Sequence, residues 1–171
     1  QTDLTNKLDN FNQAFDQQII NEIVLWKVNR YAPVTKETIE LLNKIDANST
    51  ELEIKLTREV LKSLLETKGI QLPMASTILR FKNEKIYQII DQRVYRIINK
   101  EKKLKIKTYP TEKNIDEQIN IYLQYLTDLK IVCNSLKISF DKADRILFMA
   151  DRRINKDIPL DNYSSKKDKQ N

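Results

Sequence analysis

Apolar residues recur at intervals of three and four along almost the whole chain, which is the spacing of amphipathic helices. The pattern predicts seven helices joined by short polar segments. Their approximate limits are 8–30, 36–45, 52–68, 73–82, 92–98, 115–129 and 141–154. Because sustained heptads and internal repeats are absent, we expect a compact all-α domain rather than a coiled coil.

Capping residues mark several of these helix boundaries. Thr35 and Asp91 are expected N-caps, because hydroxyl and carboxylate side chains accept hydrogen bonds from first-turn amides. Asn114, with Glu117 three residues later, has the form of a capping box. Residues 83–90 are expected to form a loop with apolar anchors.

Composition removes several classes of function. The chain has a single glycine where average usage gives roughly 12, so neither a P-loop nor a dinucleotide-binding fingerprint can be written. It has no histidine and one cysteine, Cys133, which excludes a triad with a histidine base, a His-ligated zinc and a four-cysteine metal site. We expect no metal, no nucleotide cofactor and no other cofactor.

The extent of the apolar segments bears on location. No apolar run approaches the roughly 18 residues that span a bilayer, so we expect a cytoplasmic protein with no membrane partner, in the nucleoid or nucleus if it binds DNA. The chain begins at Gln1, without methionine, as a trimmed or partial chain would. We assign residues 1–158 to one domain and residues 159–171 to a polar, disordered tail.

Positive charge is concentrated in the middle third of the chain. Residues 1–51 hold five basic and eight acidic side chains, a net charge of −3. Residues 52–113 hold fifteen and seven, a net charge of +8, and residues 114–171 hold ten and nine, a net charge of +1. Such a segment indicates either a polyanionic partner or a lysine-rich face exposed to solvent.

The segment 61–100 carries the most specific pattern. Gly69 lies between two apolar helices separated by about five residues, which is a helix–hairpin–helix arrangement. Backbone amides of the hairpin and of the helix that starts at Pro73 are suited to a phosphate oxygen, which the helix dipole also attracts. Eighteen positions after Pro73, Asp91 begins the sequence Asp91-Gln92-Arg93-Val94-Tyr95-Arg96.

This segment resembles the helix–hairpin–helix DNA glycosylases, base-excision repair enzymes that include endonuclease III and the 8-oxoguanine glycosylases. The family hairpin reads roughly Leu-Pro-Gly-Val-Gly, and a small residue and alanine follow. Gly69-Ile70-Gln71 occupies the Gly-Val-Gly step, Ala75 the alanine, and Asp91 the start of the family's aspartate helix. The resemblance implies the family's six-helix-barrel fold and DNA as the partner.

Two positions depart from the family pattern. Gln71 replaces the second hairpin glycine, and Pro73 stands where bifunctional members carry a Schiff-base lysine. The resemblance therefore implies a monofunctional glycosylase that uses water, since proline has no amine for lyase chemistry. A monovalent cation at the hairpin is a further implied ligand.

Asp91 has two possible roles. By resemblance it is the catalytic carboxylate, which stabilises the positive charge that builds on deoxyribose as the base departs and which orients or deprotonates water. The alternative is a purely structural N-cap, since aspartate is among the commonest N-cap residues. The two roles can coexist.

Other candidate residues follow from the motif and from base extrusion. Candidate DNA-binding residues are Gly69, Ile70, Gln71, Pro73, Ala75, Arg80, Lys82, Arg93 and Arg96. Weaker candidates for a base pocket, wedge or stacking residue are Trp26, Tyr31, Tyr122, Tyr125 and Phe148, although most aromatic residues at helical spacing belong to a core.

Three functions remain in competition at this point. The first is a monofunctional helix–hairpin–helix DNA glycosylase. The second is a DNA-binding module that kept the fold without the reaction, as the altered hairpin allows. The third is a helical protein-interaction domain with no nucleic-acid role.

Overall fold

The computed structural model describes residues 2–28, 32–99 and 102–160, and within these ranges every regular element is a helix. This confirms the predicted all-α class for the described residues. The elements are α1 (Thr2–Asp9), α2 (Gln17–Val28), α3 (Lys36–Asn43), α4 (Ile54–Glu66), α5 (Leu72–Lys82), α6 (Gln92–Ile98), α7 (Glu112–Leu136), the 3-10 helix η1 (Phe140–Lys142) and α8 (Ala143–Ile154).

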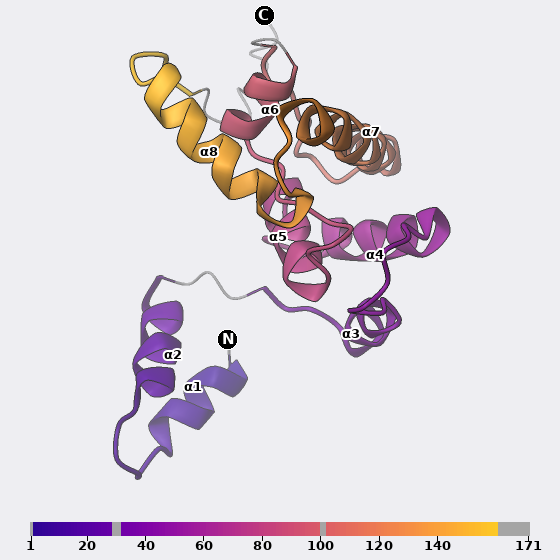
Figure 1. The fold of residues 1–171 in the computed structure, drawn as a ribbon. Coiled ribbons are helices and arrows are strands. Elements are labelled where there is room, and N and C mark those ends of the chain that lie inside the picture. Colours follow the sequence, from indigo (N-terminus) through magenta and orange to yellow (C-terminus); the bar gives the residue numbers. More distant parts are fainter. Residues whose placement is uncertain (1, 29–31, 100–101, 161–171) are drawn as a thin grey trace, which may run out of the picture.

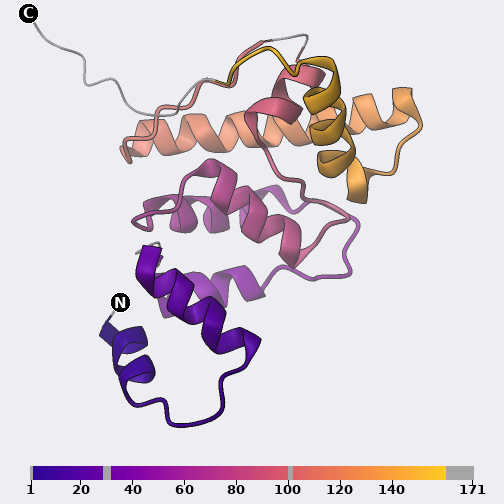
Figure 2. The ribbon, with the colours of Figure 1, turned by 90° about the vertical axis from the view of Figure 1, so that its left-hand side faces the viewer.

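The helices from α3 onward are stacked (Figures 1 and 2). α4 packs against α3, α5 and α7, while α6 packs between α7 and α8. Figure 2 shows α7 running across the molecule above α4 and α5, with α6 and α8 over one end of it. The segment from α4 to α6 therefore lies at the centre of the stack.

A single apolar core joins these elements. Its largest fully buried side chains include Tyr87, Tyr122, Tyr125, Leu61 and Leu64. Burying each such side chain contributes about 1.5–3 kcal/mol relative to leaving it in water. The expected apolar anchors of the loop between α5 and α6 are confirmed, because Ile86, Tyr87 and Ile90 are all buried.

The helix predicted over residues 8–30 is wrong, because two helices form there. α1 ends at Asp9, and α2 begins after Asp16, whose carboxylate accepts a hydrogen bond from the backbone N–H of Ile19 (2.8 Å). Phe11 and Phe15 continue the apolar spacing across the break, and in the structure their rings contact each other edge to face. Periodicity alone therefore hid the second start.

Helix caps follow the sequence signals with one correction. Thr35 and Asp91 are confirmed as N-caps, through hydrogen bonds from the amides of Thr38 and Val94. The expected cap at Asn114 is wrong, because Thr111 caps α7. The Thr111 hydroxyl accepts a hydrogen bond from the backbone N–H of Asn114 (3.2 Å).

The pair α1–α2 is separate from the main core. Leu4 and Ile19 are buried, yet neither belongs to the apolar cluster that begins at Ile45. Both views place this pair at the opposite end of the molecule from α6 (Figures 1 and 2). Several apolar side chains of α2, Trp26 and Val24 among them, are exposed.

Two structural findings concern other classes of site. None of the helices in the described ranges is long and apolar enough to cross a bilayer. Within the same ranges no three aspartate, glutamate or cysteine side chains gather as metal ligands would.

Candidate functional site

The hairpin predicted around Gly69 forms between α4 and α5. Gly69 has a φ of +91°, in the region that favours glycine, and a Cβ there would meet no atom within 4 Å. The glycine is therefore required by the backbone conformation and not by close packing. The amide of Ile70 closes the turn on the carbonyl of Thr67 (3.1 Å).

Gln71 fits this hairpin without strain. Its φ of −109° and ψ of 170° are extended backbone, which any residue adopts, so replacing the second hairpin glycine costs no backbone strain here. Gln71 is the N-cap of α5, and its side chain makes no capping hydrogen bond. The first turn of α5 therefore has no side-chain cap, which leaves it suited to an external acceptor.

The predicted DNA-binding residues of the hairpin divide into two groups. Gly69 and Gln71 are exposed and Pro73 is half-buried, so these positions can meet a ligand. Ile70 and Ala75 are buried in the core. Their role in the fold is to anchor the hairpin, so only its exposed positions are open to a ligand.

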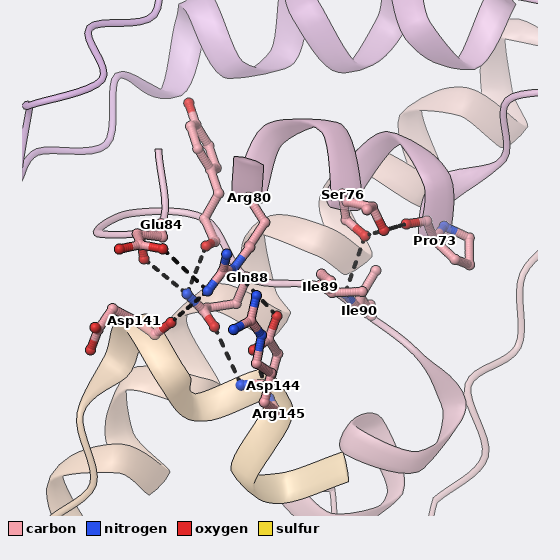
Figure 3. Close-up of polar contacts among 12 residues, drawn as sticks. Pro73, Ser76, Arg80, Glu84, Gln88, Ile89, Ile90, Asp141, Asp144 and Arg145 are labelled. Atoms are coloured by element: carbon pink, nitrogen blue, oxygen red, sulfur yellow. Dashed lines mark hydrogen bonds and ion pairs between the residues drawn. The ribbon is translucent and has the colours of Figure 1, made fainter. Parts of the chain in front are cut away.

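The loop that leads to Asp91 is fixed against the first turns of α5 (Figure 3). The Ser76 hydroxyl accepts a hydrogen bond from the amide of Ile90 (3.2 Å) and donates to the carbonyl of Pro73 (2.8 Å). Through this one side chain, the backbone beside Asp91 is tied to the helix that follows the hairpin. The structure thus brings together the two motifs that the sequence separates by eighteen positions.

Two buried tyrosines of α7 hold the same loop from the other side. The hydroxyls of Tyr122 and Tyr125 donate to the carbonyls of Gln88 (3.0 Å) and Ile89 (2.6 Å). Burial raises the pKa of both tyrosines well above the ordinary value, so both hydroxyls remain protonated donors. The loop carbonyls are therefore satisfied by donors that do not titrate at neutral pH.

Gln88 connects this loop to the start of α8. It is fully buried, and its amide nitrogen donates to the carbonyls of Glu84 (2.9 Å) and Tyr87 (2.8 Å). Its side-chain oxygen accepts from the amide of Asp144 (3.3 Å). Every heavy polar atom of the Gln88 side chain is thereby used within the protein.

Asp91 lies partly buried at the end of this loop. Its Oδ1 accepts the hydrogen bond from the Val94 amide (2.8 Å). Burial raises the pKa of Asp91, against the opposing effects of hydrogen bonds from the Val94 and Arg93 amides and of the Arg93 charge. A carboxylate with a raised pKa is a stronger base than an ordinary aspartate, which suits it to accepting a proton from water.

Arg80 and Arg96 do not face solvent, which corrects their expected place on a DNA-binding surface. Arg80 is 5% exposed, and its guanidinium lies 3.2 Å from Glu84 and 3.7 Å from Asp144. Arg96 is 8% exposed and pairs with Asp151 through two nitrogens, with Nη2 at 2.7 Å from Oδ2. Arg80 and Arg96 thus neutralise the buried carboxylates of Asp144 and Asp151 on α8, and Arg80 also pairs with the exposed Glu84.

Arg93 shares the same carboxylate. Its Nη1 lies 3.0 Å from Oδ2 of Asp151, and its guanidinium lies 5.6 Å from the centre of the Phe148 ring. Phe148 is half-buried under this cation and is not a free wedge. Burial would raise the pKa of Asp151, but hydrogen bonds from Arg96, Asn155 and Arg93 outweigh it and lower that pKa.

The remaining candidates lie elsewhere. Lys82 is half-buried, and its amine donates to Asn43 (3.3 Å). Trp26 lies on α2, at the far end from α6, where its indole N–H donates to Thr5 (2.9 Å). Tyr31 lies outside the described residues.

Sequence reasoning missed the residues that support Asp91. Tyr122 and Tyr125 were expected only as stacking candidates, which is wrong because both are buried, and Ser76 was not singled out, since helical spacing does not show which hydroxyl meets a loop. The one available signal was their polar group at a core position, since a buried hydroxyl needs a partner.

Comparisons with family models, with curated proteins and with solved structures each gave no match to this chain. The fold and the site therefore have to be interpreted from their own geometry.

Proposed function

We propose that this protein is a monofunctional DNA glycosylase in which Asp91 is the catalytic residue. One observation carries the proposal: a partly buried aspartate with a raised pKa directly follows a loop that is hydrogen-bonded to the first turns of the helix after the Gly69 hairpin. A phosphate held by the hairpin and the N-terminus of α5 would bring its nucleotide towards this carboxylate.

The reaction requires little beyond these groups. The N-glycosidic bond breaks with its electron pair leaving on the base, and positive charge develops at C1′ of the deoxyribose. The ionised Asp91 stabilises that charge and accepts a proton from the attacking water, whose oxygen bonds to C1′. No amine attacks the sugar, since Pro73 stands at the lysine position of bifunctional relatives of the resembled family.

The test is release of a free base from duplex oligonucleotides that each carry one modified base, measured as abasic-site formation. We expect Asp91→Asn to lower base release by at least about 100-fold, the contribution typical of one general base, while duplex binding is retained. Asp116→Asn, an exposed aspartate of α7, is the matched control and should keep full activity. Unchanged base release in Asp91→Asn would exclude this mechanism.

A second candidate is a DNA-binding module without catalysis. The specific observation in its favour is that Asp91 already serves as the N-cap of α6, which accounts for an aspartate at this position without chemistry. This candidate predicts duplex binding together with no base release from any modified substrate, whether or not Asp91 is replaced.

A further inference from the structure

The outer side of α8 carries a row of basic side chains. Arg145, Arg152 and Arg153 lie on α8, Lys142 ends η1 directly before the helix, and Lys156 lies in the turn after its C-cap Asn155. All five side chains are exposed. We call these five residues the α8 basic row. At 1.5 Å per residue its helical part, from Arg145 to Arg153, extends over about 12 Å.

No carboxylate of α8 interrupts this row. The two acidic residues of the helix, Asp144 and Asp151, are on its buried side, where they face Arg80, Arg93 and Arg96. In the described part of the chain, no ion pair is formed by any member of the α8 basic row. The two negative charges of α8 are therefore inside and its three positive charges outside, while Asp141 before the helix and the exposed Asp157 after it flank the row.

The row also lies on an open surface. Figures 1 and 2 show α8 at the edge of the molecule, with α6 and α7 on one side of it only. Arg145 has an exposed side chain, while Ala143 and Leu147 of the same helix are buried in the core. A ligand can thus approach along the whole helix without displacing another element.

We infer that the α8 basic row binds the phosphate backbone of double-stranded DNA. Arg145 and Arg152 are two helical turns apart, about 10 Å along the helix axis, with Arg153 beside Arg152, and a duplex offers one charge per about 1.7 Å of its axis. Long arginine and lysine side chains can follow such a regular array of charges. Three of the five are arginines, whose planar guanidinium matches phosphate oxygens with two donors.

A membrane surface fits this helix less well. Interfacial helices present a broad apolar face that enters the bilayer beneath their basic residues. In α8 the apolar side chains Ala143, Leu147 and Phe148 are used by the core, and the exposed apolar side chains Ile146, Met149 and Ile154 are too few for a broad apolar face. Binding to anionic lipid is therefore an outcome against the inference.

This surface is distinct from the site at Asp91. α8 packs on α6 through the side that carries Asp151, and the row occupies the other side of the helix. DNA held by the row is therefore separated from Asp91 by α8 itself. The inference shares only its nucleic-acid partner with the proposed function, and it needs no catalysis.

The test is binding of a fluorescently labelled, random-sequence duplex to the full chain over a range of salt concentrations. The variant Arg145→Gln/Arg152→Gln/Arg153→Gln removes three charges of the row. Its control, Lys44→Gln/Lys55→Gln/Lys113→Gln, removes three exposed charges, from the C-cap of α3, from α4 and from α7. Thermal melting followed by circular dichroism checks that both variants are folded.

We expect the arginine variant to bind at least 10-fold more weakly at low salt. Each phosphate contact contributes about 0.9 to the slope of log K against log salt, so the slope should fall by about 2.7. The control should keep the slope of the unmodified protein. Equal weakening in both variants, no effect in the arginine variant, or binding to phosphatidylserine vesicles in place of duplex would each overturn the inference.

The same assay separates this inference from the proposed function. Asp91→Asn should bind duplex with an unchanged salt slope, because Asp91 is not part of the row. Absence of base release from every substrate would contradict the glycosylase and leave the binding result intact. If a base is released but duplex binding is the same in the arginine variant, the glycosylase is supported and the role of the α8 basic row is contradicted.

Discussion

At the scale of single residues, Asp91 combines a stabilising and a destabilising contribution. Its hydrogen bond to Val94 caps α6, while burial of its negative charge raises its pKa. A raised pKa means that the folded protein binds the proton more tightly than the unfolded chain. Ionised Asp91 therefore costs stability, as functional residues often do.

Asparagine at position 91 should make this cost measurable. Asparagine caps helices as well as aspartate and carries no charge. Between the ordinary aspartate pKa and the raised value in the folded state, the unmodified protein loses stability as pH rises, and Asp91→Asn does not. We expect the variant to gain stability over the unmodified protein at neutral pH and to lose this advantage below the ordinary pKa.

Urea unfolding of both proteins at neutral and acidic pH measures this difference. Asp91→Ala is the control for the cap, and it should be about 1 kcal/mol less stable than Asp91→Asn at either pH. If Asp91→Asn is instead less stable at neutral pH, ionised Asp91 stabilises the fold and the assigned pKa direction is wrong.

Arg80 and Arg96 show the limit of sequence reasoning at this scale. Arginines that flank a hairpin indicate a phosphate-binding surface, and the net charge of +8 in residues 52–113 favoured the same interpretation. Their partners, Asp144 and Asp151, lie 64 and 55 positions further along the chain. Which side of a short helix is buried depends on such distant contacts, and local spacing does not report them.

At the scale of elements, helical periodicity and capping chemistry predicted most of the described chain. Thr35 and Asp91 start their helices as expected, because an N-cap is decided by local hydrogen bonds. The gap between α1 and α2 was not predicted, since apolar spacing continued through it. The loop before α6 was predicted as a loop, but its anchoring by α5 and α7 depends on tertiary contacts.

That anchoring leads to a prediction for Tyr125. Its hydroxyl is the donor to the Ile89 carbonyl, so Tyr125→Phe leaves a buried acceptor without a partner. We expect a loss of about 1–3 kcal/mol in the free energy of unfolding. Tyr109→Phe, at a side chain that is 75% exposed, should leave stability unchanged.

Denaturant unfolding of the two variants checks the role of the Tyr125 hydroxyl. Equal stability of Tyr125→Phe and the unmodified protein would mean that water satisfies the Ile89 carbonyl. In that case the tyrosine packs beside the loop without holding it in place.

At the scale of the whole molecule, charge is sorted by position in the fold rather than along the sequence. The most basic segment, residues 52–113, uses Arg80 and Arg96 inside the protein and the half-buried Arg93 in an ion pair with Asp151. The nearly neutral C-terminal third instead presents the α8 basic row, because its matching acids are buried. A count along the chain could not have located that surface, since it depends on which side of α8 meets α6.

The separation of α1 and α2 from the core bears on whether residues 1–158 fold as one unit. Leu4 and Ile19 pack outside the main cluster, and α1 packs against α2. We therefore expect the fragment 32–171 to fold cooperatively. Its free energy of unfolding should lie within about 1 kcal/mol of the full chain, a shift of roughly 2–4 °C in Tm.

Thermal melting of the fragment and the full chain by circular dichroism measures this shift. Matching transitions would mean that α1 and α2 add little to the stability of the rest, so that their exposed apolar side chains have to be explained by another role. A fragment that melts without cooperativity would show the opposite, because α3 to α8 would then need α1 and α2 in order to fold. Loss of cooperativity in the fragment would support one domain over 1–158, whereas matching transitions would place a domain boundary between α2 and α3.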